Sequence, residues 1–124
     1  MRRIRIRSGK VEATAVLDDS PTSQAIWDAL PIEGRANTWG EEIYFTIPVS
    51  LGLAEGAREV VEVGELGYWP PGRAFCIFFG RTPVSRGDEV RAASPVNVFG
   101  RVEGNPKVFK KVRDGDPITL ERAD

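Results

Sequence analysis

The sequence predicts one mostly β domain, folded as a closed antiparallel barrel with a short helix against each end. Most apolar segments alternate with a period of two, which is typical of strands that bury one face. Only two segments have helical spacing, whereas a doubly wound sheet needs a helix between successive parallel strands. The length of 124 residues suffices for one hydrophobic core but not for two. We therefore treat residues 1–124 as a single domain.

An N-terminal hairpin is the first predicted element. Ile4 and Ile6 alternate with arginines, as expected of a strand with one face in water. A turn-forming run follows at residues 8–10, and apolar residues alternate again over residues 11–17. We expect the two segments to pair as antiparallel strands.

The first helix is predicted over residues 20–30. Ser20 can cap free backbone N–H groups, and Pro21 is tolerated at the first helical position because its missing donor costs nothing there. Ile26 and Leu30 lie at helical spacing, and a proline directly after Leu30 ends the segment. The pattern indicates a short amphipathic helix.

Residues 35–48 are predicted to form one strand with two different faces. The apolar face, expected to point into the barrel, consists of Ile43, Phe45 and Ile47. The opposite face, expected to point outward, consists of Glu42, Tyr44 and Thr46. After this strand, residues 51–58 are a loop or a helical turn, and residues 60–63 are a short strand or a connector.

The segment 75–79 is apolar on both faces, which predicts a buried, central strand. Its inward residues are expected to be Phe75, Ile77 and Phe79, and its outward residues Cys76 and Phe78. Another part of the chain must therefore cover its outward face. Before this strand, residues 66–72 combine aromatic side chains with two prolines and a glycine, which predicts a structured loop.

The last third of the chain contains a loop, two strands and a second helix. Residues 82–94 are polar and contain glycine, which predicts a long loop, and residues 96–102 alternate as a strand does. Asn105 followed by proline repeats the capping signal and predicts a short helix over residues 105–112. The final predicted strand contains residues 118–120.

The composition excludes several classes of function. Lys+Arg 17 nearly balance Asp+Glu 18, for a net charge of -1, so the chain lacks the positive field that favours nucleic acids and anionic membranes. Neither is an expected partner. The chain has no histidine, which removes the commonest metal ligand and the usual general base near neutral pH. We expect no metal, no cofactor and no catalytic constellation.

The sequence also predicts a cytoplasmic location. With Cys76 as its one cysteine, the chain cannot form an intrachain disulfide, which fits a reducing compartment. The basic run at residues 1–7 lacks the apolar stretch of a signal peptide, and no apolar run approaches the length of a membrane span. Cys76 itself lies between phenylalanines, which is typical of a small buried hydrophobic residue.

Several sequence runs are similar to those of the cyclophilins. Three resemble the second half of that family: GRAFCI at 72–77, VFGRV at 98–102 and ITL at 118–120. Three others resemble more closely the small prokaryotic cyclophilin-like proteins of uncharacterised function: WGEEIYF at 39–45, YWPPG at 68–72 and FGRTP at 79–83. The resemblance covers nearly the whole chain and implies a cyclophilin-like barrel.

Cyclophilins are peptidyl-prolyl isomerases, and the resemblance implies that their groove would lie on the outside of the barrel. Its arginine would fall within residues 37–48, which contain Glu41 and Glu42 but no arginine. Cys76 stands at the position of the pocket phenylalanine, no tryptophan follows Phe75, and the chain has no histidine. The resemblance thus implies the barrel but not the isomerase site.

We predict a binding module whose outer groove holds an unidentified small molecule or peptide segment. The residues expected to line the groove are Glu42, Tyr44, Tyr68, Trp69, Arg73, Cys76 and Phe78. Trp39 is a further aromatic of this kind, although such residues also plug barrel ends. Glu41 and Glu42 point to opposite faces of a strand, so paired-carboxylate chemistry is not expected. The alternatives left open are a peptidyl-prolyl isomerase with a diverged site and a structural or homo-oligomerising protein.

Overall fold

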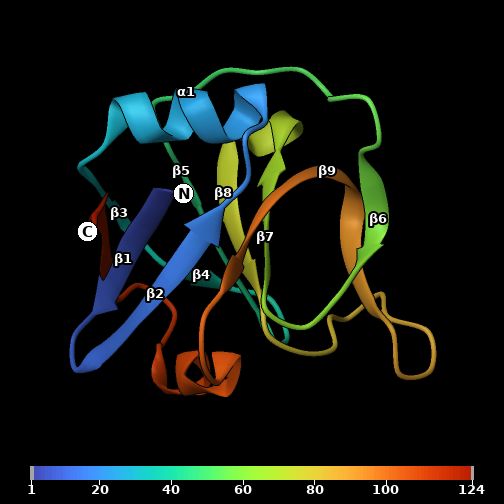
Figure 1. Ribbon diagram of the computed structural model, residues 1–124. Coiled ribbons are helices and arrows are strands. Elements are labelled where there is room, and N and C mark those ends of the chain that lie inside the picture. Colours follow the sequence, from blue (N-terminus) through green and yellow to red (C-terminus); the bar gives the residue numbers. More distant parts are fainter. Residues whose placement is uncertain (1, 124) are drawn as a thin grey trace.

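The computed structural model describes residues 2–123, in which a largely antiparallel sheet curls around a hydrophobic core (Figure 1). The strands are β1 (Arg2–Ser8), β2 (Val11–Leu17), β3 (Ile32–Arg35), β4 (Asn37–Thr38), β5 (Glu42–Thr46), β6 (Arg58–Val61), β7 (Glu65–Trp69), β8 (Ala74–Phe78), β9 (Val90–Val102) and β10 (Pro117–Arg122). The helical segments are α1 (Pro21–Ala29) and the 3-10 helices η1 (Pro70–Gly72) and η2 (Pro106–Lys111). The hydrogen-bonded order is β3-β10-β1-β2-β9-β7-β8-β5-β4, and β6 pairs with β9 beside this path.

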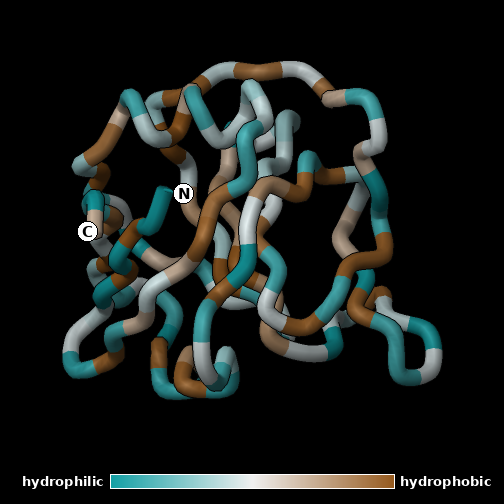
Figure 2. The backbone as a smooth tube through the Cα atoms, viewed as in Figure 1, coloured by the Kyte–Doolittle hydropathy of each residue, from teal (hydrophilic) through white to brown (hydrophobic). Residues whose placement is uncertain are grey.

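The N-terminal hairpin forms as the sequence predicts. β1 and β2 pair antiparallel, with Ile4 opposite Ala15 and Ile6 opposite Ala13. Both isoleucines are fully buried, whereas the arginines that alternate with them, Arg3, Arg5 and Arg7, lie on the outer face and form ion pairs with nearby glutamates. Figure 2 shows this alternation of hydrophilic and hydrophobic residues along the hairpin.

The two ends of the sheet meet at Ala36, but hydrogen bonds do not close the barrel. The N–H of Ala36, between β3 and β4, donates to the carbonyl of Asp116 at 2.8 Å. The N–H of Thr38 in β4 donates instead to Oδ1 of Asp114 at 2.9 Å, so a side chain takes the place of a ladder partner. Within residues 2–123 no ladder joins β3 to β4. The closed barrel expected from the sequence is therefore not confirmed, although the chain is mostly β and its sheet is curled.

The strand expected over residues 35–48 is interrupted by a turn. Gly40 has a φ of 61°, and a Cβ there would lie 2.9 Å from the carbonyl oxygen of Arg81, so the position favours glycine. The N–H of Trp39 donates to the carbonyl of Glu42 at 2.9 Å, and the chain reverses between β4 and β5. The alternation alone did not reveal this turn because both sides of it are extended.

The core inside the curled sheet contains the predicted inward faces of β5 and β8. The ring of Phe75 stacks on that of Phe45 and packs edge-on against that of Phe99, with centroids 5.4 Å apart in each pair. All the residues predicted to point inward belong to this core: Ile43, Phe45, Ile47, Phe75, Ile77 and Phe79. As predicted, β8 is an interior strand, paired on its two edges with β5 and β7.

A second apolar cluster lies on the outside of β8. The first part of β9, residues 90–96, pairs with β6, and we call β6 and residues 90–96 the outer ribbon (Figure 1). The cluster consists of Val61, Ala74, Cys76, Phe78, Val90, Ala92 and Val96. The outer ribbon is thus the cover that the two-sided apolar pattern of β8 requires. The prediction of a loop over residues 82–94 is wrong from residue 90 onward, because the partner strand that orders this segment is distant in sequence.

The segment 66–69, predicted as part of a loop, is also a strand. It belongs to β7, which pairs with β8 on one edge and with β9 on the other. Only the Pro-Pro-Gly run that follows forms the expected rigid turn, as η1. Aromatic residues next to prolines occur both in loops and in strands. Here the segment is a strand because it pairs with a neighbouring strand on each of its two edges.

The two longer helical segments lie at opposite ends of the curled sheet (Figure 1). α1 begins as predicted, with Oγ of Ser20 accepting a hydrogen bond from the N–H of Ser23 at 3.2 Å and Pro21 in the first turn. Ile26 of α1 and Phe109 of η2 are fully buried in the core. The second helix is of the 3-10 type. No helix within residues 2–123 has the length and apolar character needed to cross a membrane.

Candidate functional site

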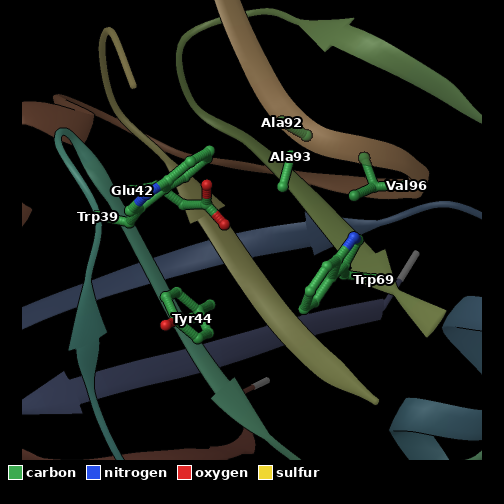
Figure 3. A pocket seen from close by; sticks show the side chains of 7 residues that line it. All are labelled: Trp39, Glu42, Tyr44, Trp69, Ala92, Ala93 and Val96. Carbon is green, nitrogen blue, oxygen red and sulfur yellow. The ribbon is translucent and has the colours of Figure 1, made fainter. Parts of the chain in front are cut away.

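A cavity of about 280 Å³ opens on the outer side of the sheet, where β5 and β7 meet the outer ribbon. Figure 3 shows three aromatic rings and a carboxyl group around it, with small apolar side chains opposite them. The lining residues are Trp39, Glu42, Tyr44, Trp69, Ala92, Ala93 and Val96. The cavity is therefore mostly apolar, with one acidic group.

The alternation of β5 places Glu42 and Tyr44 in this cavity. Residues two apart on a strand share a face, and the residues that alternate with them, Ile43 and Phe45, belong to the core. Glu42 lies opposite Phe78 on β8, and Tyr44 lies opposite Cys76. The outward face of β8 thus lies next to the two lining residues.

The indole of Trp69 is fixed at the end of β7 by contacts on two sides. Its Nε1 donates a hydrogen bond to Oγ of Ser94 on the outer ribbon at 2.6 Å. Gly72 lies against its ring, and a Cβ at residue 72 would lie 2.8 Å from Cζ3 of the indole. The ring is therefore held between η1 and the outer ribbon, with its face available to form a cavity wall.

Glu42 is the buried polar group of the cavity. The residue is 5% exposed, and its Oε1 atom is enclosed without receiving a hydrogen bond from any residue of the described range 2–123. Burial raises the pKa of Glu42 from 4.5 to about 7, and the neighbouring Cys76 thiol opposes part of this rise. Near neutral pH the carboxyl group is thus close to half protonated and can either donate or accept a hydrogen bond.

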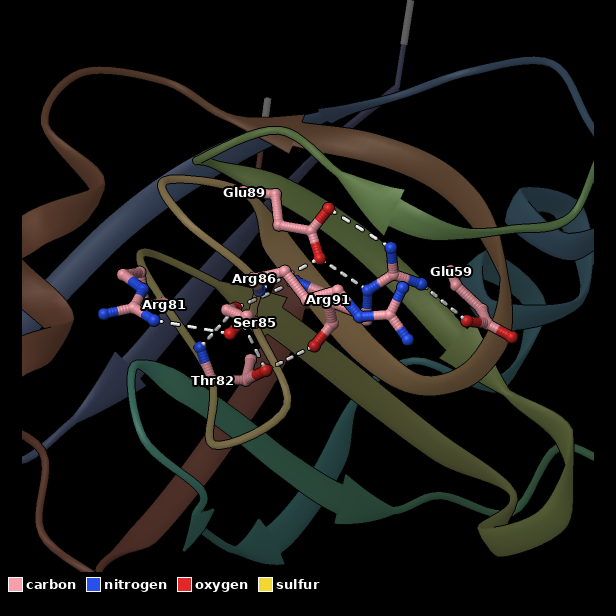
Figure 4. Close-up of polar contacts among 7 residues, drawn as sticks. All are labelled: Glu59, Arg81, Thr82, Ser85, Arg86, Glu89 and Arg91. Atoms are coloured by element: carbon pink, nitrogen blue, oxygen red, sulfur yellow. Dashed lines mark hydrogen bonds and ion pairs between the residues drawn. The ribbon is translucent and has the colours of Figure 1, made fainter.

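Arg91 anchors the outer ribbon beside the cavity. Its Nη1 donates to Oε2 of Glu59 on β6 at 2.9 Å, and its guanidinium also pairs with Glu89 (Figure 4). Its backbone N–H donates to Oγ of Ser85 at 3.2 Å, and that hydroxyl also accepts from the N–H of Thr82 at 2.9 Å. These contacts order the loop before β9 and hold the next two residues, both alanines, against the cavity.

The structure brings together three of the predicted groove residues: Glu42, Tyr44 and Trp69. Cys76 and Phe78 lie on the expected outward face of β8, but both are buried beneath the outer ribbon and do not line the cavity. Burial raises the pKa of the Cys76 thiol well above its ordinary value, so the thiol is protonated and unreactive. The prediction that Cys76 and Phe78 line an open groove is therefore wrong.

Tyr68 and Arg73, which were expected to line the groove, do not line this cavity either. Tyr68 lies opposite Phe75, and residues directly opposite each other on paired strands share a face, so its ring lies in the core. Its hydroxyl donates to the carbonyl of Val49 at 2.6 Å. Arg73 has a φ of 46° and ends the η1 turn with its side chain exposed, where its carbonyl accepts from the N–H of Ile47. Its role is in the turn.

Sequence reasoning missed one wall of the cavity. The sequence pattern places Ala92 and Ala93 in the loop expected over residues 82–94, and Val96 in a strand for which it predicts no site. Small apolar residues carry no chemical signal, so only the pairing of β9 with β6 could have identified them. Trp39 was noted as a groove-type aromatic, and the turn at the following glycine brings it over Glu42.

The two adjacent glutamates point to different places, as strand alternation predicts. Oε2 of Glu41 lies 3.4 Å from Nζ of Lys110 and 3.6 Å from Nζ of Lys107, in the region of η2. Glu42 faces the outer cavity instead. Within residues 2–123 there is no cluster of three or more cysteine, aspartate and glutamate side chains suited to a metal ion.

Comparison with known proteins assigns the family. A family model described as cyclophilin-like matches residues 2–121. The chain belongs to the cyclophilin-like family. A hypothetical protein from Archaeoglobus fulgidus, known from a solution structure, is similar to this cyclophilin-like chain at 46% sequence identity. The match covers 98% of this chain and 95% of that one, with a TM-score of 0.85. A search of curated proteins found no match.

The cavity of this cyclophilin-like chain is mostly apolar with one acidic group. No arginine is among the residues that line it, and its one ionisable group that can carry charge near neutral pH is the carboxyl of Glu42. A carboxylate accepts hydrogen bonds, whereas the isomerase mechanism implied by the family resemblance needs a cationic donor.

Proposed function

We propose that this cyclophilin-like protein is a non-catalytic binding module whose outer cavity holds a small molecule. Glu42 carries this proposal, because its buried Oε1 atom has no hydrogen-bond donor. Leaving a buried acceptor unpaired costs roughly 1–3 kcal/mol, and a ligand that donates a hydrogen bond to it removes that cost. The ligand we propose therefore carries a donor group.

The shape of the cavity supports a small molecule over a peptide segment. Its volume of about 280 Å³ is at the small end of ligand pockets. Three aromatic walls and one convergent polar group are the usual composition of a site that orients a compact, partly apolar ligand. We further propose that the protein acts in the cytoplasm and that neither nucleic acid nor a membrane is its partner.

A fragment screen by NMR would test the proposed cavity. The chain has 3 tryptophans, so a ¹H–¹⁵N spectrum contains three indole N–H signals. We expect fragments that carry a donor group to shift the signals of Trp39 and Trp69. Trp27 is an internal control, because it belongs to α1 and does not line the cavity, and the guanidinium groups of Arg2 and Arg122 lie over its ring.

Two variants make the screen specific. Ala93→Leu should fill the cavity and abolish the shifts, because Ala93 lines the cavity and is otherwise exposed. Glu42→Gln should weaken the binding of fragments that carry a donor group. The matched variant of the neighbouring residue, Glu41→Gln, should leave their binding unchanged. If no fragment shifts the two indoles, or if Ala93→Leu leaves the shifts intact, the proposed function is wrong and the structural role becomes the better explanation.

We also expect no peptidyl-prolyl isomerase activity. The barrier to rotation about a peptide bond is about 18–20 kcal/mol and comes from amide resonance, so a catalyst must stabilise the twisted amide. At the cavity, Glu42 would repel the electron density that develops on the prolyl nitrogen, and loss of one such donor costs on the order of a hundredfold in rate. A protease-coupled assay with purified protein should give the background rate. A rate well above background that Ala93→Leu removes would contradict this expectation.

A further inference from the structure

We infer that the cavity selects protonated amines with a small apolar substituent and that the bound amine pairs with the ionised form of Glu42, so that binding removes the proton from any Glu42 that still carries one. This inference rests on the proposed binding function and names the class of ligand. It follows from three features of the site: the charge that faces the cavity, the aromatic walls, and the enclosure of the carboxyl group.

The charge on the cavity wall is negative when Glu42 is ionised and absent when it is protonated. Glu42 is the one carboxyl group among the lining residues, and no lysine or arginine lies among them. From β8, the group that faces Glu42 is the buried thiol of Cys76, and from β5 itself it is the phenol of Tyr44. On the outer ribbon, Arg91 is held by two glutamates. The residues that line the cavity thus supply no cation to pair with an ionised Glu42, and a cationic ligand would supply it.

The aromatic walls favour the same ligand charge. Trp39, Tyr44 and Trp69 surround the carboxyl group in Figure 3. A cation near the face of a tryptophan or tyrosine ring is attracted by the ring quadrupole, and the attraction is larger when the cation is desolvated. A neutral donor gains the hydrogen bond to Glu42 but not this attraction. An anion would meet the acid and the negative ring faces.

The enclosure of the carboxyl group connects binding with a proton. Without a ligand, the enclosed carboxyl retains its proton up to near neutral pH, since burial raises its pKa to about 7. An alkylammonium ion, which stays protonated at this pH, pairs with the carboxylate form. The carboxylic acid therefore gives its proton to the solvent, and the bound state contains one ammonium and one carboxylate. No covalent bond forms and no other reactant is needed.

Titration calorimetry with benzylamine would test this inference, with benzyl alcohol as the neutral isostere. We expect benzylamine to bind more tightly than benzyl alcohol. At pH 7, its heat of binding should depend on the ionisation enthalpy of the buffer. The slope of this dependence should correspond to about half a proton released per amine bound. Its affinity should rise about tenfold between pH 6 and pH 8, because the ionised fraction of Glu42 rises from about a tenth to about nine tenths.

Variants and a second ligand assign the effect to the carboxyl group. Glu42→Gln should abolish both the proton release and the pH dependence, and Glu41→Gln should preserve them. Because the wild-type measurement reports proton release directly, the inference is testable even if Glu42→Gln does not fold. Benzylamine that binds without proton release, or benzyl alcohol that binds equally well, would overturn the inference.

The two proposals fail in different ways. If the fragment screen yields ligands that shift the indole signals of Trp39 and Trp69 but benzylamine is not among them, the inference about amines is wrong and the binding function stands. If no ligand of any charge shifts these signals, the binding function itself is wrong.

Discussion

Phe75→Ala is expected to lower the free energy of unfolding by about 3–5 kcal/mol, the usual cost of truncating a buried phenylalanine. Phe75 is fully buried and contacts the rings of Phe45 and Phe99, with centroids 5.4 Å away in each case. These three rings come from β8, β5 and β9, so the cavity left by truncation has walls on three strands and cannot collapse easily. Urea unfolding monitored by tryptophan fluorescence would measure the change.

Thr46→Ala is the matched control for this truncation. Thr46 lies on the outward face of β5, where it is exposed and its Oγ1 donates to the carbonyl of Gly72 at 3.0 Å. We expect a loss of less than about 1 kcal/mol, the net value of one solvent-accessible hydrogen bond. Equal losses at the two positions would mean that the inward and outward faces of these strands are assigned the wrong way round.

The second large effect is a fall in stability with rising pH that depends on Glu42. Its pKa is about 7 in the folded chain and takes its ordinary value of 4.5 once the chain unfolds. As the pH rises from 4.5 to 7, the unfolded chain loses this proton while the folded chain retains it, so the folded state loses stability. Above about pH 7 both states are ionised and the loss is complete. It amounts to about 3 kcal/mol, since one pKa unit corresponds to about 1.4 kcal/mol.

Urea unfolding at pH 5 and pH 9 would measure this effect, with Glu42→Gln as the comparison. The variant cannot ionise at position 42. The difference in stability between variant and wild type should therefore shift in favour of the variant by about 2.5 kcal/mol between pH 5 and pH 9, since part of the loss has already occurred at pH 5. Glu41→Gln should show the wild-type dependence. An unchanged difference between Glu42→Gln and wild type across this range would show that the carboxyl group is not desolvated in the folded chain.

Cys76 and Glu65 titrate outside the pH range in which Glu42 titrates. There is no histidine, and burial moves the pKa of the Cys76 thiol further above its ordinary value. Burial has the largest single effect on the pKa of Glu65 and acts to raise it, but the hydrogen bonds from Arg58 and from the N–H of Glu62, together with the charges of Arg58 and Arg101, leave that pKa lowered. The stability that Glu65 contributes is therefore lost in acid, below the range in which Glu42 titrates.

Local patterns predicted much of this fold because local geometry determines them. The hairpin of β1 and β2 follows from alternation with an intervening turn, and the start of α1 from Ser20 and Pro21. The inward and outward faces of β5 and β8 follow from the period of two. Of the candidate site, the same alternation brought Glu42 and Tyr44 to one surface. Each of these depends on neighbours within a few residues.

Three other features depend on residues that are far apart in sequence. Residues 90–94 became a strand because β6 pairs with them, and that pairing supplies the alanine wall of the cavity. Tyr68 lies in the core because its position opposite Phe75 sets its face. No ladder joins the two ends of the sheet within residues 2–123, and at one of these ends the N–H of Thr38 in β4 donates to a side chain, that of Asp114, which is distant in sequence.

The sequence by itself determined that this protein is a mostly β, cyclophilin-like chain with an acidic, aromatic outward surface on β5. Only the tertiary structure decided that this surface is enclosed. The outer ribbon covers β8, and with Trp39 and Trp69 it reduces the exposure of Glu42 to 5%. The pattern of a strand tells which side a glutamate faces, but the desolvation that raises its pKa depends on segments that pack over it from elsewhere in the chain.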